Sequence, residues 1–178
     1  MNGLEISDYS PQQLRESRDS ESLLYYVNLC FDRMHGKYGC FDKPRFEDMD
    51  EFFDNFKHPE AVLSVARDSQ SRDIVSICGF RPLTDSMVEL KCLCVDAKQE
   101  GKGYGAFMTR YVEDKARERG FKTMQSIVIR QHGNLVEFYQ KLGYQKMEEK
   151  RLIAGGDDMG FGNVVDITIW FLEKELNT

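Results

Sequence analysis

The sequence lacks the features that would place the protein in a membrane or a secretory pathway. No apolar stretch approaches the roughly 20 residues that a membrane-spanning helix needs. The N-terminal Met-Asn-Gly-Leu-Glu has no basic segment followed by an apolar run, so we expect no signal peptide. Residue 2 is Asn, whereas a myristoylation signal has Gly there. We therefore expect no membrane partner and a cytoplasmic location, with the nucleus as the alternative compartment.

Metal-binding signals are also scarce. The chain has three histidines and five cysteines, and no two cysteines have the CxxC spacing. A structural zinc site usually needs four ligands at recognisable spacing, so we expect no metal. The odd number of cysteines favours buried free thiols in a reducing compartment over a set of disulfides. The cysteines are Cys30, Cys40, Cys78, Cys92 and Cys94.

Positive charge is in the minority, with 24 Lys and Arg against 30 Asp and Glu and a formal net charge of −6. Nucleic-acid binding favours a basic patch, so we expect no nucleic-acid partner. The length of 178 residues, 41% of them hydrophobic, suits one domain that spans residues 1–178.

The hydrophobic periodicity changes along the chain and predicts a mixed α/β fold. The expected strands are residues 4–7, 62–67, 74–81, 87–95, 123–129, 144–153 and 164–172, and the expected helices are residues 20–34, 46–56, 103–119 and 134–142. The order is therefore β-α-α-β-β-β-α-β-α-β-β. We expect a mostly antiparallel sheet in which the helix at 103–119 makes one right-handed parallel crossover between the strands at 87–95 and 123–129.

A glycine-rich segment between a strand and a helix is the most informative motif. It reads Glu100-Gly101-Lys102-Gly103-Tyr104-Gly105-Ala106. Glycines let the backbone approach a ligand, and the free N–H groups of a helix N-terminus favour a pyrophosphate. The spacing excludes a Walker A loop. A dinucleotide-binding loop stays open as an alternative, because Gly101, Gly103 and Ala106 match GxGxxA. Arg130 could then lie near a 2′-phosphate. However, too little chain follows this motif to complete a doubly wound sheet. A glycine turn without a ligand stays open as well.

Three segments resemble the GNAT superfamily of acyl-CoA-dependent N-acyltransferases. Gly103 and Gly105 match the small positions of its acyl-CoA loop, [RQ]-x-x-G-x-[GA], while Glu100 stands where the family has Arg or Gln. Upstream, residues 89–96 read ELKCLCVD and resemble the family's fourth strand. Downstream, residues 134–144 read NLVEFYQKLGY and resemble its N-x-x-A-x-x-F-Y-x-K-x-G-F segment, with one residue fewer and without the Ala.

The resemblance implies a GNAT-like fold and an N-acetyltransferase that uses acetyl-CoA as co-substrate. In the family, the fourth strand splays from its neighbour, and its backbone binds the pantetheine arm as a pseudo-strand. The residues implied to bind acetyl-CoA are Leu93, Cys94, Val95, Glu100, Gly101, Lys102, Gly103, Tyr104, Gly105, Ala106 and Asn134. Two alternatives stay open: the side chain of Lys102 points to solvent, and Asn134 is the N-cap of its helix.

The resemblance also implies how an amine attacks the thioester directly in a ternary complex. Glu89 would be the base, with a pKa that burial raises; the alternative is a solvated residue on the polar face of a strand. Tyr139 would be the acid that protonates the leaving thiolate; the alternative is a buried aromatic ring beside Phe138. The backbone N–H of Leu93 or Cys94 would stabilise the oxyanion.

The resemblance implies an amine acceptor, and we expect a small molecule rather than a protein lysine or N-terminus. We expect the loops at residues 35–44 and 155–162 to form its pocket. Asp157 and Asp158 would attract a cationic amine there, unless they only form a solvated hairpin tip. We expect His132 in a surface loop. A non-catalytic acyl-CoA-binding module is the alternative function, and the resemblance is compatible with a homodimer.

Overall fold

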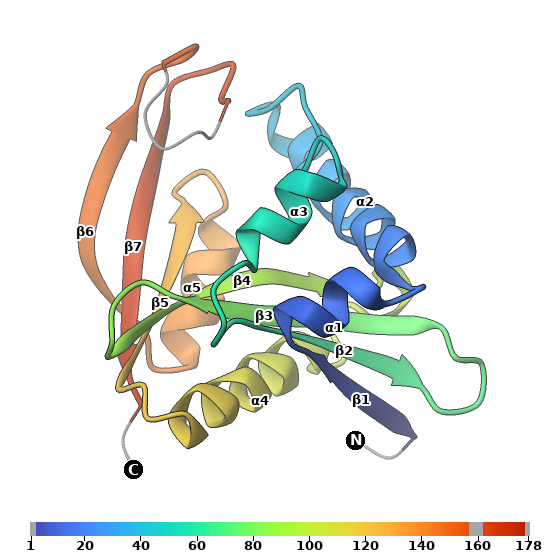
Figure 1. Ribbon diagram of the computed structural model, residues 1–178. Coiled ribbons are helices and arrows are strands. Elements are labelled where there is room, and N and C mark those ends of the chain that lie inside the picture. Colours follow the sequence, from blue (N-terminus) through green and yellow to red (C-terminus); the bar gives the residue numbers. More distant parts are fainter. Residues whose placement is uncertain (1–2, 157–161, 177–178) are drawn as a thin grey trace.

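The computed structural model describes residues 3–156 and 162–176, which build one seven-stranded sheet (Figure 1). The strand order is β1-β2-β3-β4-β5-β7-β6. The strands are β1 (Leu4–Tyr9), β2 (Val62–Asp68), β3 (Ile74–Pro82), β4 (Met87–Val95), β5 (Thr123–Ile129), β6 (Gln145–Leu152) and β7 (Ile167–Glu175). Neighbouring strands pair antiparallel except for β4 and β5, which are parallel. The predicted mixed sheet with one central crossover is confirmed.

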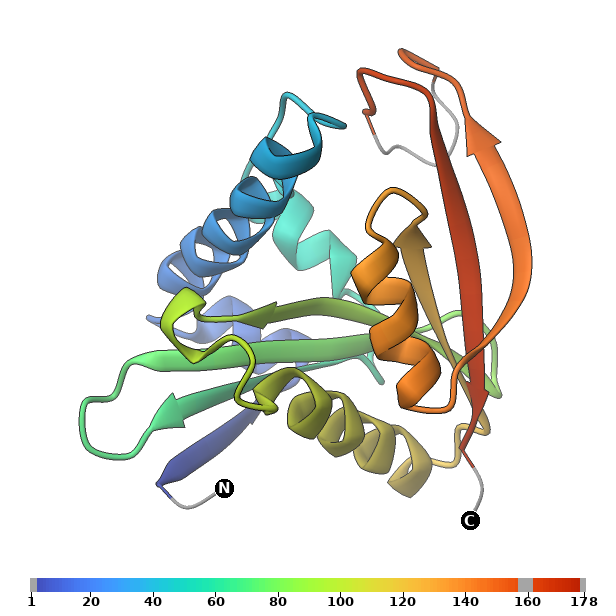
Figure 2. The ribbon, with the colours of Figure 1, turned by 180° about the vertical axis from the view of Figure 1, so that it is seen from behind.

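Helices cover both faces of this sheet. They are α1 (Pro11–Glu16), α2 (Ser20–Tyr38), α3 (Met49–Asn55), α4 (Tyr104–Glu118) and α5 (Gly133–Lys141), with a short 3₁₀ turn at Ala97–Gln99. Helices α1 to α3 pack on one face, and α4 and α5 pack on the other (Figures 1 and 2). Within the described ranges, no helix has both the length and the apolar character needed to cross a membrane.

The short helix α1 is absent from the sequence-based prediction, although the sequence carries its signal. The side chain of Ser10 accepts a hydrogen bond from the backbone N–H of Gln13, and the side chain of Gln13 accepts one from the backbone of Ser10. Pro11 occupies the first helical position, where its missing N–H costs nothing. This capping box fixes the N-terminus of a helix too short to show hydrophobic periodicity.

The bounds of α2 and α3 also differ from the prediction. Helix α2 continues through Gly36 and ends before Gly39, whose φ is 62°. A glycine inside a helix costs only about 1 kcal/mol, so Gly36 alone does not stop the helix. Helix α3 begins after Asp48, three residues later than expected from Phe46, because the side chain of Asp48 accepts a hydrogen bond from the backbone N–H of Glu51 at 2.8 Å.

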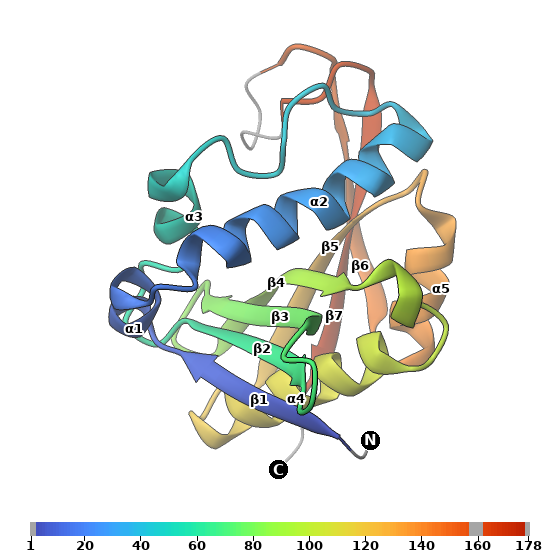
Figure 3. The same cartoon turned by 90° about the vertical axis from the view of Figure 1, so that its right-hand side faces the viewer.

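The central strands β4 and β5 separate soon after they begin. Only residues 87–89 of β4 pair with residues 123–125 of β5, and the strands then diverge, as the resemblance implied (Figure 1). Helix α2 lies along the free part of β4 (Figure 3). The divergence leaves the β5-facing edge of β4 without a strand partner over most of its length.

A β-bulge in β4 changes which side chains face α2. Cys92 has a φ of 55°, and the pairing with β3 shifts at this point. Before the bulge, Val88 and Leu90 pack in the core beneath α4. After it, Cys92 and Cys94 pack in the core beneath α2. Glu89 and Lys91 face α2 because they alternate with Val88 and Leu90, and the extra residue then places both cysteines on that same face.

Candidate active site

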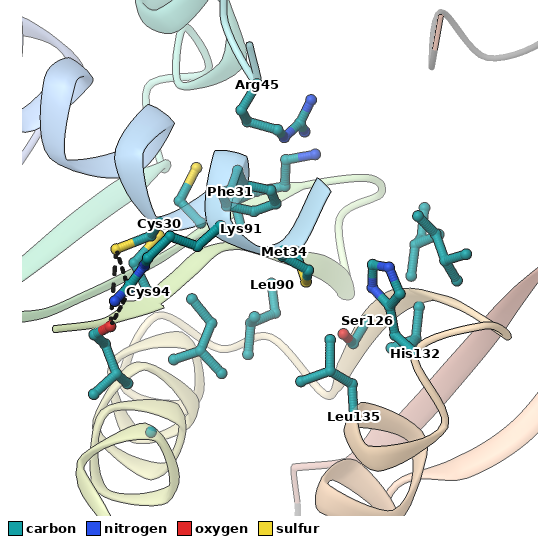
Figure 4. Close-up of a pocket in the computed structure, with 18 of the residues that line it drawn as sticks. Cys30, Phe31, Met34, Arg45, Leu90, Lys91, Cys94, Ser126, His132 and Leu135 are labelled. Atoms are coloured by element: carbon teal, nitrogen blue, oxygen red, sulfur yellow. Dashed lines mark hydrogen bonds between the residues drawn. The ribbon is translucent and has the colours of Figure 1, made fainter. Parts of the chain in front are cut away.

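The divergence of β4 and β5 opens a cavity of about 1100 Å³. Its walls come from α2 and the loop after it, β4, the glycine-rich turn before α4, β5 and α5 (Figure 4). All residues that the sequence assigned to catalysis or to acetyl-CoA binding line this cavity except Lys102. The Nζ of Lys102 instead donates to Oε1 of Gln99 at 2.9 Å.

The glycine-rich turn brings backbone to one end of the cavity. Gly101 and Gly103 have φ values of 76° and 85°, in the left-handed region that glycine adopts without strain. Gly103 is the N-cap of α4 and offers no side chain to cap it. The first N–H groups of a helix have no partner within the helix, so those of Tyr104 and Gly105 are available to a ligand. This arrangement fits a pyrophosphate group.

Glu100 is the departure from the family pattern, and its charge is partly offset. An oxygen of its carboxylate lies 3.6 Å from Nη2 of Arg33, which comes from α2 across the mouth of the cavity. The same Nη2 donates to the carbonyl oxygen of Val95 at 3.1 Å. Both partners of this ion pair are substantially exposed, so the pair adds little stability. It nevertheless keeps a guanidinium close to the turn.

The free edge of β4 supplies backbone to the middle of the cavity. Leu93, Cys94 and Val95 all line it, beyond the last residue that pairs with β5. The carbonyl oxygen of Cys94 accepts a hydrogen bond from Oγ of Ser76 at 2.6 Å. An extended ligand with amide groups would fit this edge as an additional strand does.

Glu89 lies in the cavity wall with two cationic partners. Its Oε1 accepts from Nζ of Lys91 at 2.9 Å, and its Oε2 accepts from Nε of Arg81 at 2.9 Å. Burial raises the pKa of the Glu89 carboxyl, but Lys91 and Arg81 outweigh burial and hold that pKa below its ordinary value. The expected rise in pKa is therefore wrong. The expected alternative, a solvated residue, is also wrong, because Glu89 is buried.

Tyr139 reaches the cavity from α5 and is buried. Its ring packs edge-on against Phe138 and Tyr144, and its hydroxyl interacts with the side chain of Ser126 on β5. Burial raises the pKa of the Tyr139 hydroxyl, and the hydrogen bond with Ser126 offsets only part of this rise. The hydroxyl is therefore protonated at neutral pH. The ring is both a core residue and part of the cavity wall. The expected packing beside Phe138 is confirmed, and the role of Tyr139 as an acid stays a prediction.

The residues at the start of α5 correct two expectations. The N-cap of α5 is His132, and Asn134 lies within the helix, so the capping reading of Asn134 is wrong. Asn134 instead lines the cavity, where its Oδ1 accepts from the hydroxyl of Tyr38 at 3.3 Å. His132 is buried rather than in a surface loop, because its ring stacks on Tyr38 with centroids 4.1 Å apart.

The five thiols fall into two groups. Cys30 lines the cavity from α2 and is half-buried. The pKa of Cys30 is lowered to about 7, first by a hydrogen bond with Cys94 and then by the nearby Arg33. Partial burial opposes this shift without cancelling it. Burial raises the pKa of Cys40, Cys78, Cys92 and Cys94. Among the residues with described positions, no cluster of His, Cys, Asp and Glu could hold a metal ion.

The two loops expected around the acceptor meet at the edge of the cavity. Phe41 forms an isolated antiparallel bridge with Asn163, which joins the loop after α2 to the segment before β7. Phe41, Gly156 and Gly162 line the cavity. Asp157 and Asp158, expected to attract a cationic amine, lie outside the described residues.

Three cationic side chains near Glu89 were not singled out from the sequence. Lys91 and Arg81 pair with Glu89, and Arg45 lines the cavity close to Lys91 (Figure 4). Charged residues at alternate positions of β4 hinted at Lys91. Arg45 follows Pro44 in a loop and carries no local signal, so only the tertiary fold brings it to the site.

Comparisons with known proteins agree with this fold. The model of the Acetyltransferase (GNAT) family matches residues 26–144. No curated protein matches the chain. A GNAT family acetyltransferase from Elizabethkingia anophelis with acetyl-CoA bound is 13% identical, with 98% of this chain and 99% of that chain covered and a TM-score of 0.64.

Two further solved structures share the fold. An N-acetyltransferase from Staphylococcus aureus Mu50 is 15% identical over 98% of this chain and 99% of that chain, with a TM-score of 0.69. The ribosomal-protein-S18-alanine N-acetyltransferase from Escherichia coli is 13% identical over 98% of this chain and 95% of that chain, with a TM-score of 0.68. Identities this low establish a common fold.

Proposed function

The chain belongs to the acetyltransferase (GNAT) family, and we propose that it transfers the acetyl group of acetyl-CoA to the primary amine of a small molecule. The opening between β4 and β5 beside the glycine-rich turn carries this proposal. It combines a backbone edge without a strand partner and an uncapped helix N-terminus in one cavity. These two features suit the amide groups and the pyrophosphate of an acyl-CoA.

Acetyl-CoA supplies an activated acyl group as its thioester. We place its pyrophosphate at the backbone N–H groups from Gly101 to Ala106, with Arg33 nearby to balance the charge of Glu100. The free edge of β4 from Leu93 to Val95 then binds the pantetheine arm. This placement directs the thioester toward the part of the cavity between Glu89 and Tyr139.

The attacking nitrogen has to lose a proton, and Glu89 is the residue that we propose to receive it, directly or through a water molecule. Its lowered pKa keeps the carboxylate ionised at neutral pH, so it is ready to accept a proton. The same low pKa makes it a weak base. The proton therefore passes on to solvent rather than staying on Glu89.

The remaining charge changes are assigned to the backbone of β4 and to Tyr139. When the amine attacks the thioester carbon directly, negative charge develops on the thioester oxygen. The N–H of Leu93 or Cys94 donates a hydrogen bond to this oxygen. The hydroxyl of Tyr139 is protonated and lines the same cavity, so it can protonate the departing sulfur. Asn134, already in contact with Tyr38, faces the arm of the bound acetyl-CoA.

The test combines binding and turnover in one sample. Calorimetric titration with acetyl-CoA is followed by measurement of thiol release with a mixed panel of amines. Binding together with release that one class of amine stimulates is the expected result. Binding without stimulated release would favour the alternative, a non-catalytic acyl-CoA-binding module, for which the unusual Glu100 is the specific observation. Absence of binding would refute both.

A further inference from the structure

The acceptor end of the cavity contains a guanidinium held in place by aromatic rings. The guanidinium carbon of Arg45 lies 4.8 Å from the ring centre of Phe46 and 5.6 Å from that of Phe31. Across the residues that the structure describes, no carboxylate lies within ion-pair distance of Arg45. Its position is therefore fixed by stacking while its N–H donors face the cavity without an acidic partner.

The neighbouring charges make this end of the cavity electropositive. Lys91 is buried, and one carboxylate, that of Glu89, serves both Lys91 and Arg81. Arg45 adds a third cation to this end of the cavity, where Glu89 is the one buried carboxylate among the described lining residues. The pKa of Lys91 is lowered by burial and by the positive charges of Arg45 and Arg81, whereas Glu89 alone raises it. The net lowering agrees with an excess of positive charge at this end of the cavity.

Two other carboxylates line the cavity near Arg45, and both already have partners. Oε1 of Glu47 accepts from Nζ of Lys43 at 2.6 Å. Oε2 of Glu51 accepts from the backbone N–H of Glu47 at 2.7 Å. Both side chains are exposed, so they contribute little to the field at the buried Lys91. Neither of them neutralises Arg45.

Figure 4 shows Arg45, Phe31 and Lys91 together on one side of the cavity, with His132, Ser126 and Leu135 across from them. The glycine-rich turn follows the far end of β4, beyond Val95, whereas Glu89 and Lys91 lie near the point where β4 separates from β5. Arg45 is thus near the acceptor end and far from the proposed pyrophosphate seat. An anion bound at Arg45 would therefore come from the acceptor rather than from the pyrophosphate of acetyl-CoA.

We propose that the acceptor is a small molecule that carries an anionic oxygen group next to its amine, as an amino acid does, and that Arg45 and Lys91 bind this group. This inference rests on the proposed function and names its substrate class. A guanidinium fork binds a carboxylate through two parallel hydrogen bonds, which a neutral amide cannot reproduce. Binding the anion at Arg45 and Lys91 leaves the amine free to approach Glu89.

The experiment uses matched sets of three compounds with the same side chain: an L-amino acid, its amide and the corresponding decarboxylated amine. The full set of protein amino acids is covered, with acetyl-CoA saturating and thiol release as the readout. The same compounds are titrated calorimetrically into the protein saturated with CoA, so that acceptor binding is measured whether or not turnover occurs. We expect the acids to bind and react better than the amides and the decarboxylated amines.

The variant Arg45→Gln then assigns the selectivity to its residue. We expect KM for the acids to rise about 10- to 100-fold, because a hydrogen-bonded charge contact is lost, while the values for the decarboxylated amines change much less. Arg45→Lys keeps the charge without the fork and should fall between the two. Arg15→Gln is the matched control, since Arg15 stacks on Phe53 at the same 4.8 Å outside the cavity.

The possible outcomes separate this inference from the proposed function. Acids that bind the CoA-saturated protein better than their neutral counterparts, with loss of this preference in Arg45→Gln, support the inference even if turnover is absent. Equal or better binding of the decarboxylated amines, or a preference unchanged in Arg45→Gln, overturns it while acetylation itself stands. Failure of acetyl-CoA to bind refutes the proposed function instead.

Discussion

The two ends of the cavity are built from different chemical groups. At the α4 end, the surface is backbone: Gly101 and Gly103 at positive φ and the uncapped first turn of the helix. At the other end, the surface is made by the charged side chains of Arg45, Lys91 and Glu89, drawn from a loop and from β4. One strand, β4, connects them.

This difference suggests a division of roles between the two ends. Backbone donors bind any ligand that presents a phosphate and do not select what is attached to it. Side chains from a loop and a bulged strand can differ between proteins without changing the fold. Substitutions at the acceptor end should therefore change turnover and acceptor choice, whereas substitutions at the α4 end should change acetyl-CoA affinity.

The largest effect is expected from Glu89→Gln, at the acceptor end. We expect kcat to fall about 100-fold or more, because the proposed proton acceptor is removed, while acetyl-CoA affinity stays unchanged. Steady-state kinetics and calorimetry measure the two quantities. Turnover within about twofold of the unmodified protein would exclude Glu89 as the base.

Glu113→Gln is the matched control for this variant. Glu113 is also buried and paired with a lysine, since its Oε2 accepts from Nζ of Lys174 at 2.6 Å, but it lies outside the cavity. Both substitutions disturb a buried ion pair and should lower the melting temperature. Only Glu89→Gln should reduce kcat in protein that remains folded.

The next effect is expected from Tyr139→Phe, which keeps the ring and removes the hydroxyl. We expect kcat to fall about 10- to 100-fold, since the departing sulfur loses its proton donor. Tyr144→Phe is the control, because that ring packs 5.2 Å from Tyr139 while its hydroxyl does not line the cavity. Full turnover in Tyr139→Phe would leave the residue a packing role only.

The same contrast explains what the sequence can predict. The bounds of β4 and β5 follow from their hydrophobic patterns and agree with the prediction residue by residue. The glycine-rich turn is recognisable because a backbone at positive φ demands glycine, which leaves a mark in the sequence. At this end of the cavity, local geometry and residue type are linked.

The acceptor end shows no such link. Arg45 lies close to Lys91 only because the loop between α2 and α3 brings it to β4, and no spacing rule encodes that proximity (Figure 4). Cys92 adopts a left-handed conformation that is rare for a residue with a side chain, so the residue type gives no signal in the sequence for the bulge. The pKa of Glu89 was mispredicted because burial is outweighed first by Lys91, two residues along the same strand, and then by Arg81, which comes from the neighbouring strand.

A moderate effect is expected from Gly103→Ala, at the α4 end. A left-handed conformation costs a residue with a side chain about 1–2 kcal/mol, and a shifted turn moves the N–H groups, so we expect acetyl-CoA affinity to fall about tenfold. At saturating acetyl-CoA, kcat should be retained. Gly120→Ala provides the control, because its φ of 88° lies at the other end of α4. If both variants lost acetyl-CoA affinity equally, the cause would be a loss of protein stability rather than a change at the pyrophosphate-binding turn.

The smallest effect concerns Cys30, which lies along the wall between the two ends. Because its pKa is lowered to about 7, its thiolate fraction should rise as the pH increases through 7, and its alkylation rate with iodoacetamide should level off above about pH 8. The other four thiols, whose pKa values are raised by burial, should react more slowly. Mass spectrometry of partly alkylated protein gives the rate at each site.

Acetyl-CoA should slow the reaction of Cys30, since this thiol lines the cavity close to Arg33 and to the free end of β4. An unreactive acceptor analogue bound alone at Arg45 should protect it less, because Arg45 lies toward the other end. Equal protection of Cys30 by both ligands would mean that the two ends of the cavity act as one binding surface. The proposed division, with acetyl-CoA bound by backbone groups at one end and the acceptor bound by side chains at the other, would then be wrong.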